Sequence, residues 1–241
     1  MAAAPAPQEN MLVNLLINVA APSIILSKFS GEHSLGPTWG LIVALAFPIG
    51  YGLWDFIRRR KVNFFSAIGV FSTFLTGGMT LLKLPPEYVA IKEASIPLLF
   101  GLATLGSLYT PFPLVRTFLY NEKVLQVERV NHALKHYGTE QAFERTLVVA
   151  SWMLAGSFFL SAVLNYGLAK YLLVSAPGTE AYNAELGKMT ALSFPVITIP
   201  SMLVLVGALW FLLNRIKSLT HLKLEEIFND GQADSKTTAD M

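Results

Sequence analysis

A few polar side chains interrupt the long apolar stretches of this sequence, and they are the residues best placed to do chemistry. Three are amides, Asn14, Asn18 and Asn165, and two are charged, Asp55 and Lys92. Polar groups are costly in an apolar environment, so they face a protein interior or a hydrated path. We take these five as candidates for a ligand site or a path for a small solute or ion. Taken singly, each has a simpler structural explanation: an interhelical hydrogen bond or an ion pair and anchor at a helix end.

Basic residues lie at the ends of the same apolar stretches. Five of them are candidate topology determinants and contacts for lipid headgroups: Arg58, Arg59, Arg60, Lys61 and Arg116. Asp55 lies three and four residues before the first two arginines and can pair with either on a helix. Clusters of this kind bind anionic headgroups of the cytoplasmic leaflet.

Catalytic and metal-binding patterns are missing from the sequence. His132 and His136 have the spacing of a metal-binding pair, but no Glu follows His132 and no third ligand is evident, so we interpret them as a solvated helix face. The chain has no cysteine, which excludes thiolate nucleophiles and iron–sulfur sites. We find no Ser–His–acid arrangement, phosphate-binding loop or pair of intramembrane carboxylates. We therefore predict a non-enzymatic protein with no cofactor and no metal.

The composition indicates lipid as the natural solvent of the chain. Charged residues make up 14% of the 241 residues, hydrophobic residues make up 53%, and the mean hydropathy is +0.50. Soluble proteins average about 25% charged residues. The composition excludes a disordered chain and a disulfide-rich secreted module, and a net charge of only +2 argues against a nucleic-acid partner.

Six apolar stretches are long enough to cross about 30 Å of hydrocarbon as helices. They carry charges only near their ends and lie at about 10–28, 36–57, 62–83, 94–115, 146–170 and 189–214. The sequence therefore predicts an all-α, polytopic membrane protein with a six-helix transmembrane domain over residues 11–217. We expect residues 1–10 to be a disordered N-terminal tail and residues 218–241 to be a cytoplasmic C-terminal tail.

The distribution of basic residues predicts the orientation. Of the 18 Lys and Arg residues, thirteen lie on the side that also carries both termini and five on the other. Because cytoplasmic loops carry the excess of Lys and Arg, both termini are predicted to lie in the cytoplasm.

The one long connection, between the fourth and fifth stretches, has its own pattern. Apolar residues recur at helical spacing from Val127 to Tyr137, with charges on the other faces. This predicts an amphipathic helix on the cytoplasmic interface, starting near Asn121 and ending at Gly138. Thr139 is then placed to cap a helix that runs into the fifth span.

Short motifs in order along the chain resemble the intracellular septation protein A family, the YciB-like inner-membrane proteins. The motifs are Phe56-Ile57-Arg58-Arg59-Arg60-Lys61, Gly77-Gly78-Met79-Thr80-Leu81, Ile91-Lys92, Pro113-Leu114-Val115-Arg116, Leu164-Asn165-Tyr166 and Met189-Thr190-Ala191-Leu192. The resemblance covers roughly residues 37 to 217 and implies a divergent member of this family. It implies a multi-pass protein of the bacterial inner membrane that is linked to the cell envelope and septation, and it supplies no catalytic residues.

Two functions follow as hypotheses. The first is a role in cell-envelope organisation or septation, exerted through membrane lipids and through envelope or division proteins. The alternative is a small-solute or ion transporter or channel, whose path is lined by the intramembrane asparagines and the helix-end charges. A hydrated cavity lined by those side chains would distinguish the second from the first.

Tags on the two ends of the chain test the predicted topology. In intact cells or sealed spheroplasts, we expect tags at both ends to be protected from an impermeant reagent and to react only after permeabilisation. Labelling of the two ends from opposite faces would contradict an even number of spans.

Overall fold

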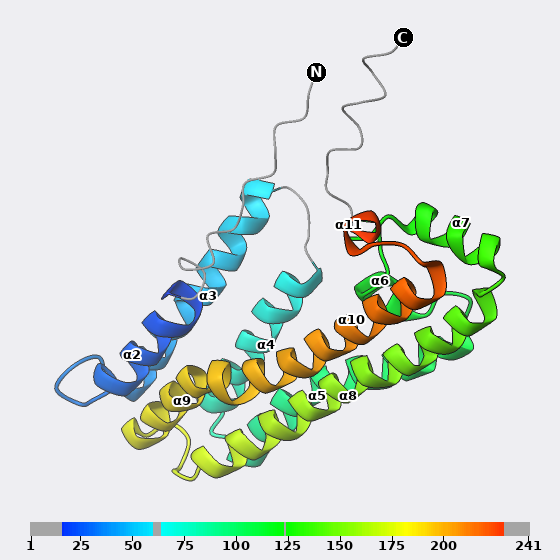
Figure 1. The fold of residues 1–241 in the computed structure, drawn as a ribbon. Helices are drawn as coiled ribbons and strands as arrows, with labels where there is room; N and C mark the ends of the chain where they lie inside the picture. Colours follow the sequence, from blue (N-terminus) through cyan, green and yellow to red (C-terminus); the bar gives the residue numbers. More distant parts are fainter. Residues whose placement is uncertain (1–15, 60–63, 123, 229–241) are drawn as a thin grey trace. The chain divides into compact units, whose positions relative to one another are not determined.

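The computed structural model describes residues 16–59, 64–122 and 124–228, and these residues form helices joined by short connections (Figure 1). One isolated antiparallel bridge joins Leu125 to Phe228. The first elements in chain order are η1 (Leu16–Ala20, a π-helix), α2 (Ala21–Lys28), α3 (Gly36–Arg59), α4 (Phe64–Leu81), α5 (Pro86–Gly106) and η2 (Ser107–Tyr109, a 3-10 helix). The remaining ones are α6 (Leu114–Phe118), α7 (Val127–Tyr137), α8 (Glu140–Leu172), α9 (Glu180–Ser193), η3 (Phe194–Thr198, a π-helix), α10 (Ile199–Thr220) and α11 (Leu224–Ile227).

The chain divides into two compact units. Unit 1 contains residues 1–94 and 163–197, and unit 2 contains residues 95–162 and 198–241. The chain passes from one unit to the other inside α5, inside α8 and near the end of η3. Each of these three boundaries therefore lies within a helical segment.

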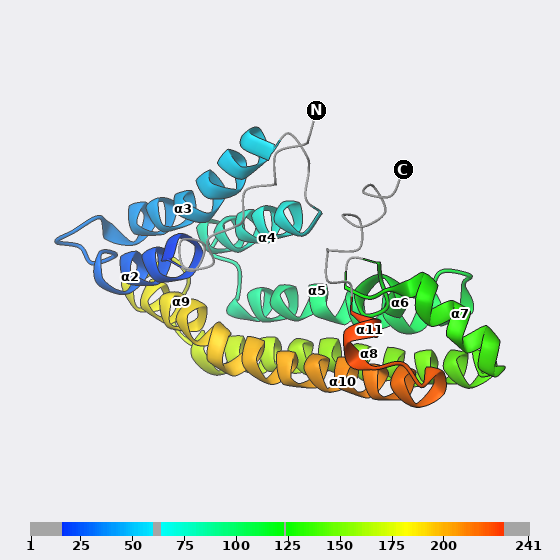
Figure 2. The same ribbon diagram turned by 45° about the horizontal axis from the view of Figure 1, so that its top comes forward.

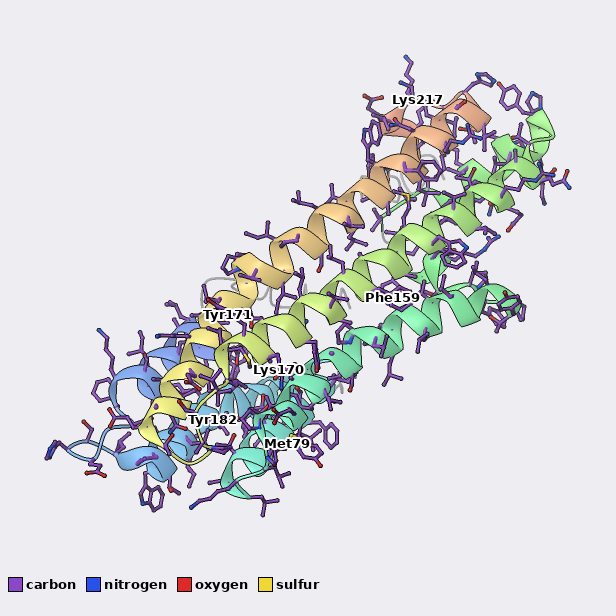
Figure 3. The ribbon with its side chains drawn as sticks, turned by 90° about the horizontal axis from the view of Figure 1, so that it is seen from below. Met79, Phe159, Lys170, Tyr171, Tyr182 and Lys217 are labelled. Atoms are coloured by element: carbon purple, nitrogen blue, oxygen red, sulfur yellow. The ribbon has the colours of Figure 1, made fainter. Side chains whose placement is uncertain are left out.

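Unit 1 is built around α2, which packs against α9 and α3, while α3 also packs against α4 (Figure 2). The buried apolar side chains of this unit form one cluster, to which Tyr182 belongs and against which Met79 packs; both are labelled in Figure 3. Its buried members are Leu26, Leu41, Ala44, Val89, Ala90, Leu168, Ala169, Leu173, Tyr182, Leu186, Met189 and Ile197.

The contact between α2 and α9 is close enough to require a glycine. A Cβ atom added at the buried Gly187 would lie 2.9 Å from the carbonyl oxygen of Ser23 and 3.1 Å from Cβ of Leu26. Because backbone atoms of α2 are among these neighbours, the two helices would have to separate to accommodate a larger residue.

Polar side chains fix the loops of unit 1 to α9. The buried Asn183 amide donates to the hydroxyl of Ser30, at 3.1 Å, and to the carbonyl of Pro37, at 2.7 Å. The carboxylate of Glu185 accepts hydrogen bonds from the backbone N–H groups of Val174 and Ser175. The connections before α3 and before α9 are therefore held by side chains that are polar for a structural reason.

In unit 2, α7 and α11 pack against the C-terminal part of α10. The core combines these helices with the adjoining part of α8, and its buried members are Val115, Leu119, Tyr120, Leu125, Val130, Leu134, Phe143, Leu147, Ala150, Leu154, Ala208, Leu212, Ile216 and Ile227. The segment after residue 217, expected to be a tail, thus contributes the fully buried Ile227 to this core.

The structure has a helix where an amphipathic one was predicted, but it begins at Val127 and not near Asn121. It ends as expected at Gly138, whose φ of +64° places it in the left-handed conformation that closes many helices. Val130 and Leu134 on its apolar face are buried in the core of unit 2, so this part of the face contacts protein. The cytoplasmic placement of α7 stays a prediction. Thr139 does precede α8, and its hydroxyl donates to the carbonyl of Leu219, at 2.9 Å.

Four described helices are long and apolar enough to cross a membrane: Gly36–Trp54, Pro86–Tyr109, Glu140–Leu172 and Glu180–Thr220. They overlap the spans predicted at 36–57, 94–115, 146–170 and 189–214. The predicted end at 115 is wrong, because Pro111 and Pro113 follow η2 and interrupt the helix.

The other two predicted spans overlap shorter apolar helices, Leu16–Lys28 and Ala67–Leu81. Residues 10–15 and 62–63 of these stretches lie outside the described residues, so the number of six spans stays a prediction.

The long helices place large apolar side chains on their outer surfaces. Gly36–Trp54 and Glu180–Thr220 each contain an apolar segment of 18 residues, and only 17% of that segment is buried inside the protein. Phe71, Leu203 and Trp210 are each more than 60% exposed. Surfaces of this kind require apolar surroundings, which a bilayer provides.

Replacing glycine by alanine at two helix positions tests the packing of unit 1. Gly187→Ala introduces the contact with α2, whereas Gly167→Ala in α8 meets nothing within 4 Å. The gain in helix propensity is shared by both variants, so their stabilities should differ by the overpacking cost, roughly 1–3 kcal/mol. Thermal unfolding in one detergent measures this difference, and equal melting temperatures would contradict the close contact.

Candidate functional site

The most unusual polar group among the described residues of unit 1 is a buried lysine. Lys92 lies on α5, six residues after Pro86 and so about 9 Å along the axis from the start of that helix. Its side chain is only 8% exposed. The ammonium donates to the hydroxyls of Thr76, at 2.7 Å, and Ser72, at 2.9 Å, and to the carbonyl of Ser72, at 3.3 Å.

The counter-charge comes from the next residue on the same helix. Nζ of Lys92 lies 2.6 Å from Oε1 of Glu93, whose side chain is 25% exposed. Successive helix residues do not face each other, so two long side chains must curl together to meet in this way. Unit 1 also contains an ordinary exposed pair, Glu87 with Lys170 (labelled in Figure 3), in which both side chains are about half exposed.

The Lys92–Glu93 pair borders a partly open pocket inside unit 1, with a volume of about 270 Å³. Half of the described residues that line it are polar: Asn18, Ser72, Thr73, Thr76, Lys92, Glu93, Asn165, Thr190 and Ser193. The others are apolar: Val19, Pro22, Leu26, Leu45, Pro48, Leu168, Leu186, Met189 and Ile197. Polar groups therefore converge on a cavity from helices that are otherwise apolar, as in many ligand sites.

Irregular helical backbone surrounds this pocket. Asn18 and Val19 lie in η1, and Ile197 lies in η3, so both π-helical segments supply lining residues. Pro48 lies inside α3 and has no N–H, which leaves the carbonyl of Ala44 without its intrahelical partner. π-helical turns and proline kinks are frequent at functional sites, because they redirect side chains and free backbone polar groups.

The structure brings three of the predicted site residues together. Asn18, Lys92 and Asn165 all line the pocket, from η1, α5 and α8. Asn14 lies outside the described residues, and Asp55 belongs to α3 with a side chain that is not described.

The basic cluster is described only in part. Arg58 and Arg59 end α3, but their side chains, like the whole of Arg60 and Lys61, lie outside what the structure describes. Their predicted contact with lipid headgroups stays a prediction.

Arg116 belongs to unit 2, where it pairs with Glu144 on the surface. Near this pair the hydroxyl of Tyr120 donates to Oδ1 of Asn131, at 2.9 Å. Burial raises the pKa of Tyr120 to about 12, against a smaller opposing effect of Arg116, so this hydroxyl is a neutral donor at physiological pH. These contacts hold α6 and α7 within unit 2. The predicted contact of Arg116 with lipid headgroups stays a prediction.

Sequence reasoning identified none of the hydroxyl groups of the pocket lining as site residues and missed the role of Glu93. Charges were taken as the limits of the fourth span, which placed Lys92 and Glu93 at a helix end, whereas α5 begins at Pro86. A detectable signal existed on α4, where Ser72, Thr73 and Thr76 share one face at helical spacing.

Neither the arrangement of potential metal ligands nor the comparison with known proteins assigns a function to this chain. Within the described residues there is no group of three or more His, Cys, Asp and Glu side chains that could hold a metal ion. His136 contacts the ring of Tyr137, which also contacts the ring of His221.

No protein-family model, curated protein or solved structure matches the chain. The resemblance to the septation protein A family is therefore still a prediction.

Two lysine substitutions test the buried ion pair. Lys92→Met leaves Glu93 partly buried without its partner, and breaking a buried pair costs roughly 3–5 kcal/mol, an upper bound here because Glu93 is 25% exposed. Lys170→Met removes the partner of an exposed carboxylate and should change the melting temperature little.

A double variant separates charge from packing. Lys92→Met with Glu93→Gln should recover part of the stability lost in Lys92→Met, because no uncompensated carboxylate remains. Equal losses for Lys92→Met and Lys170→Met would show that the buried pair has no special role.

Proposed function

We propose that this chain is a membrane transporter of small solutes and that the pocket of unit 1 is its solute-binding site. The observation that supports this most directly is the convergence of Asn18, Lys92, Glu93 and Asn165 on one cavity. The helices that supply them are apolar and expose apolar surfaces. In such a chain a polar cavity has a cost that a well-packed apolar interior does not have.

The alternative explanation for these residues is interhelical adhesion. Adhesive polar contacts need only one partner each and leave no space between the helices. Here Lys92 contacts Ser72, Thr76 and Glu93, yet a volume of about 270 Å³ remains beside these side chains. The geometry therefore favours a site that receives a ligand.

The size of the pocket limits the solute. Pockets for drug-sized ligands measure roughly 300–1,000 Å³. A volume of about 270 Å³ lies just below this range and fits a solute with few non-hydrogen atoms. The π-helical and proline-containing segments around it are the places where helices can bend as the pocket opens and closes.

A non-enzymatic role in cell-envelope organisation or septation is the second hypothesis, and its support is the motif resemblance alone. Capture of an envelope or division protein from membranes, against a control membrane protein of unrelated span count, would test it. The inner-membrane location and cytoplasmic termini belong to both hypotheses.

Flux measurements test the transport proposal. The full chain is reconstituted in liposomes, and uptake is followed for amino acids, short amines, short carboxylates and polyols. At least one solute should enter faster than into protein-free liposomes. Asn18→Leu should reduce that flux by about 3- to 10-fold, the effect of losing one or two neutral hydrogen bonds.

The matched control is Asn214→Leu, which changes an exposed asparagine of α10 in unit 2 and should leave the flux unchanged. Flux equal to that of protein-free liposomes for every solute, with the protein still helical, would contradict the proposal.

A further inference from the structure

We propose that the pocket of unit 1 selects a protonated amine with a short apolar body, which binds to the carboxylate of Glu93. This inference rests on the proposed function and assigns the chemical class of its solute. It follows from which hydrogen-bonding positions of the pocket are already used and which remain.

Among the described residues that line the pocket, Lys92 carries the one cationic group, and its ammonium has no remaining donor. An ammonium has three N–H donors, and Nζ of Lys92 has four oxygen acceptors within 3.3 Å, two from Ser72, one from Thr76 and one from Glu93. An anionic ligand would therefore have to break one of these contacts to gain a hydrogen bond from Lys92.

The carboxylate of Glu93 has unused capacity. A carboxylate offers about four acceptor positions on two oxygens. In the described structure Glu93 accepts from Nζ of Lys92 through Oε1, which leaves the acceptor positions of Oε2 for a donor on a ligand.

The hydroxyl groups that line the pocket, like Glu93, are available mainly as hydrogen-bond acceptors. Four of them donate their proton to a carbonyl of their own helix: Thr73 to Gly69, Thr76 to Ser72, Thr190 to Leu186 and Ser193 to Met189. Their oxygen lone pairs can accept hydrogen bonds, although Thr76 already accepts one from Lys92. The amides of Asn18 and Asn165 can donate and accept, so they favour neither sign. The remaining capacity of the pocket is thus mainly for donors.

Lys92 is itself an example of a primary ammonium bound by the oxygen atoms of this pocket. It is a primary ammonium held by two hydroxyls, a carbonyl and a carboxylate. A soluble amine presents the same head group, and one carboxylate neutralises one ammonium where the dielectric is low. The amine and Lys92 therefore compete for Glu93, and removal of Lys92 should strengthen amine binding.

The apolar half of the lining defines the rest of the solute. Leu26, Leu45, Leu186 and Met189 border the same pocket as Glu93. A bare inorganic cation would leave these side chains without contacts, whereas an alkyl chain buries apolar surface against them. Affinity should rise about fourfold for each methylene group until the pocket is full.

Three probes of equal length test the sign of the charge: n-butylammonium, n-butyrate and n-butanol. Binding to the full chain in lipid nanodiscs is measured at constant ionic strength by calorimetry and by the shift in melting temperature. n-Butylammonium should bind, and the other two should bind at least about tenfold more weakly, because they lack the charge-assisted contact to Glu93.

Variants locate the contact. Glu93→Gln should weaken n-butylammonium binding at least about tenfold, whereas Glu87→Gln, which changes an exposed carboxylate of the same helix, should not alter it. Lys92→Met should bind n-butylammonium more tightly than the unmodified chain does. The comparison of the three probes on the unmodified chain remains decisive if a variant fails to fold.

Each other result overturns the inference. Binding of n-butyrate that Lys92→Met abolishes would identify an anion site, and equal binding of n-butanol would show that charge is not recognised; both leave the proposed transport function intact. Binding of none of the three probes also overturns the inference, and the flux measurements then decide the transport function separately.

Discussion

A cationic side chain inside a bundle of apolar helices must find both a counter-charge and hydrogen-bond acceptors within the protein. Lys92 meets this requirement with four oxygen contacts, from Ser72 and Thr76 on α4 and from Glu93 on its own helix. The desolvation of such a charge is costly, so the arrangement is stable only while all of these contacts are kept. The hydroxyls on one face of α4 and the carboxylate beside Lys92 are consequences of the same constraint.

The pocket exists because the helices around this pair are not regular. Close packing of straight helices removes internal space, and unit 1 shows such packing where Gly187 of α9 contacts α2. Around Lys92, by contrast, the two π-helical segments and the proline inside α3 interrupt the regular ladder of hydrogen bonds. Tight packing in the middle of α9 and irregular backbone directly after its C-terminal end are therefore found within a single unit.

Unit 2 uses its polar residues differently. Tyr120 with Asn131, and Arg129 with Glu226, join neighbouring short helices. The buried residues Val130 and Leu134 place the apolar face of α7 within the core. Polar side chains in this unit hold short segments in place, whereas those around Lys92 border a partly open pocket.

The sequence by itself determined the helical class, the apolar nature of the long helices and the polar residues worth examining. These features depend on composition and on periodicity along one helix, which are local properties. It did not determine that Asn18, Lys92 and Asn165 border one pocket, because 147 positions separate the first from the last and the packing of several helices brings them together. Nor did it determine that the Lys92–Glu93 pair lies inside a helix. The residues Lys-Glu can form a neutralised pair within a helix or a solvated pair at a helix end, and the sequence is the same in both cases. Only the tertiary structure decided these points, because burial and hydrogen-bond partners are set by neighbouring helices.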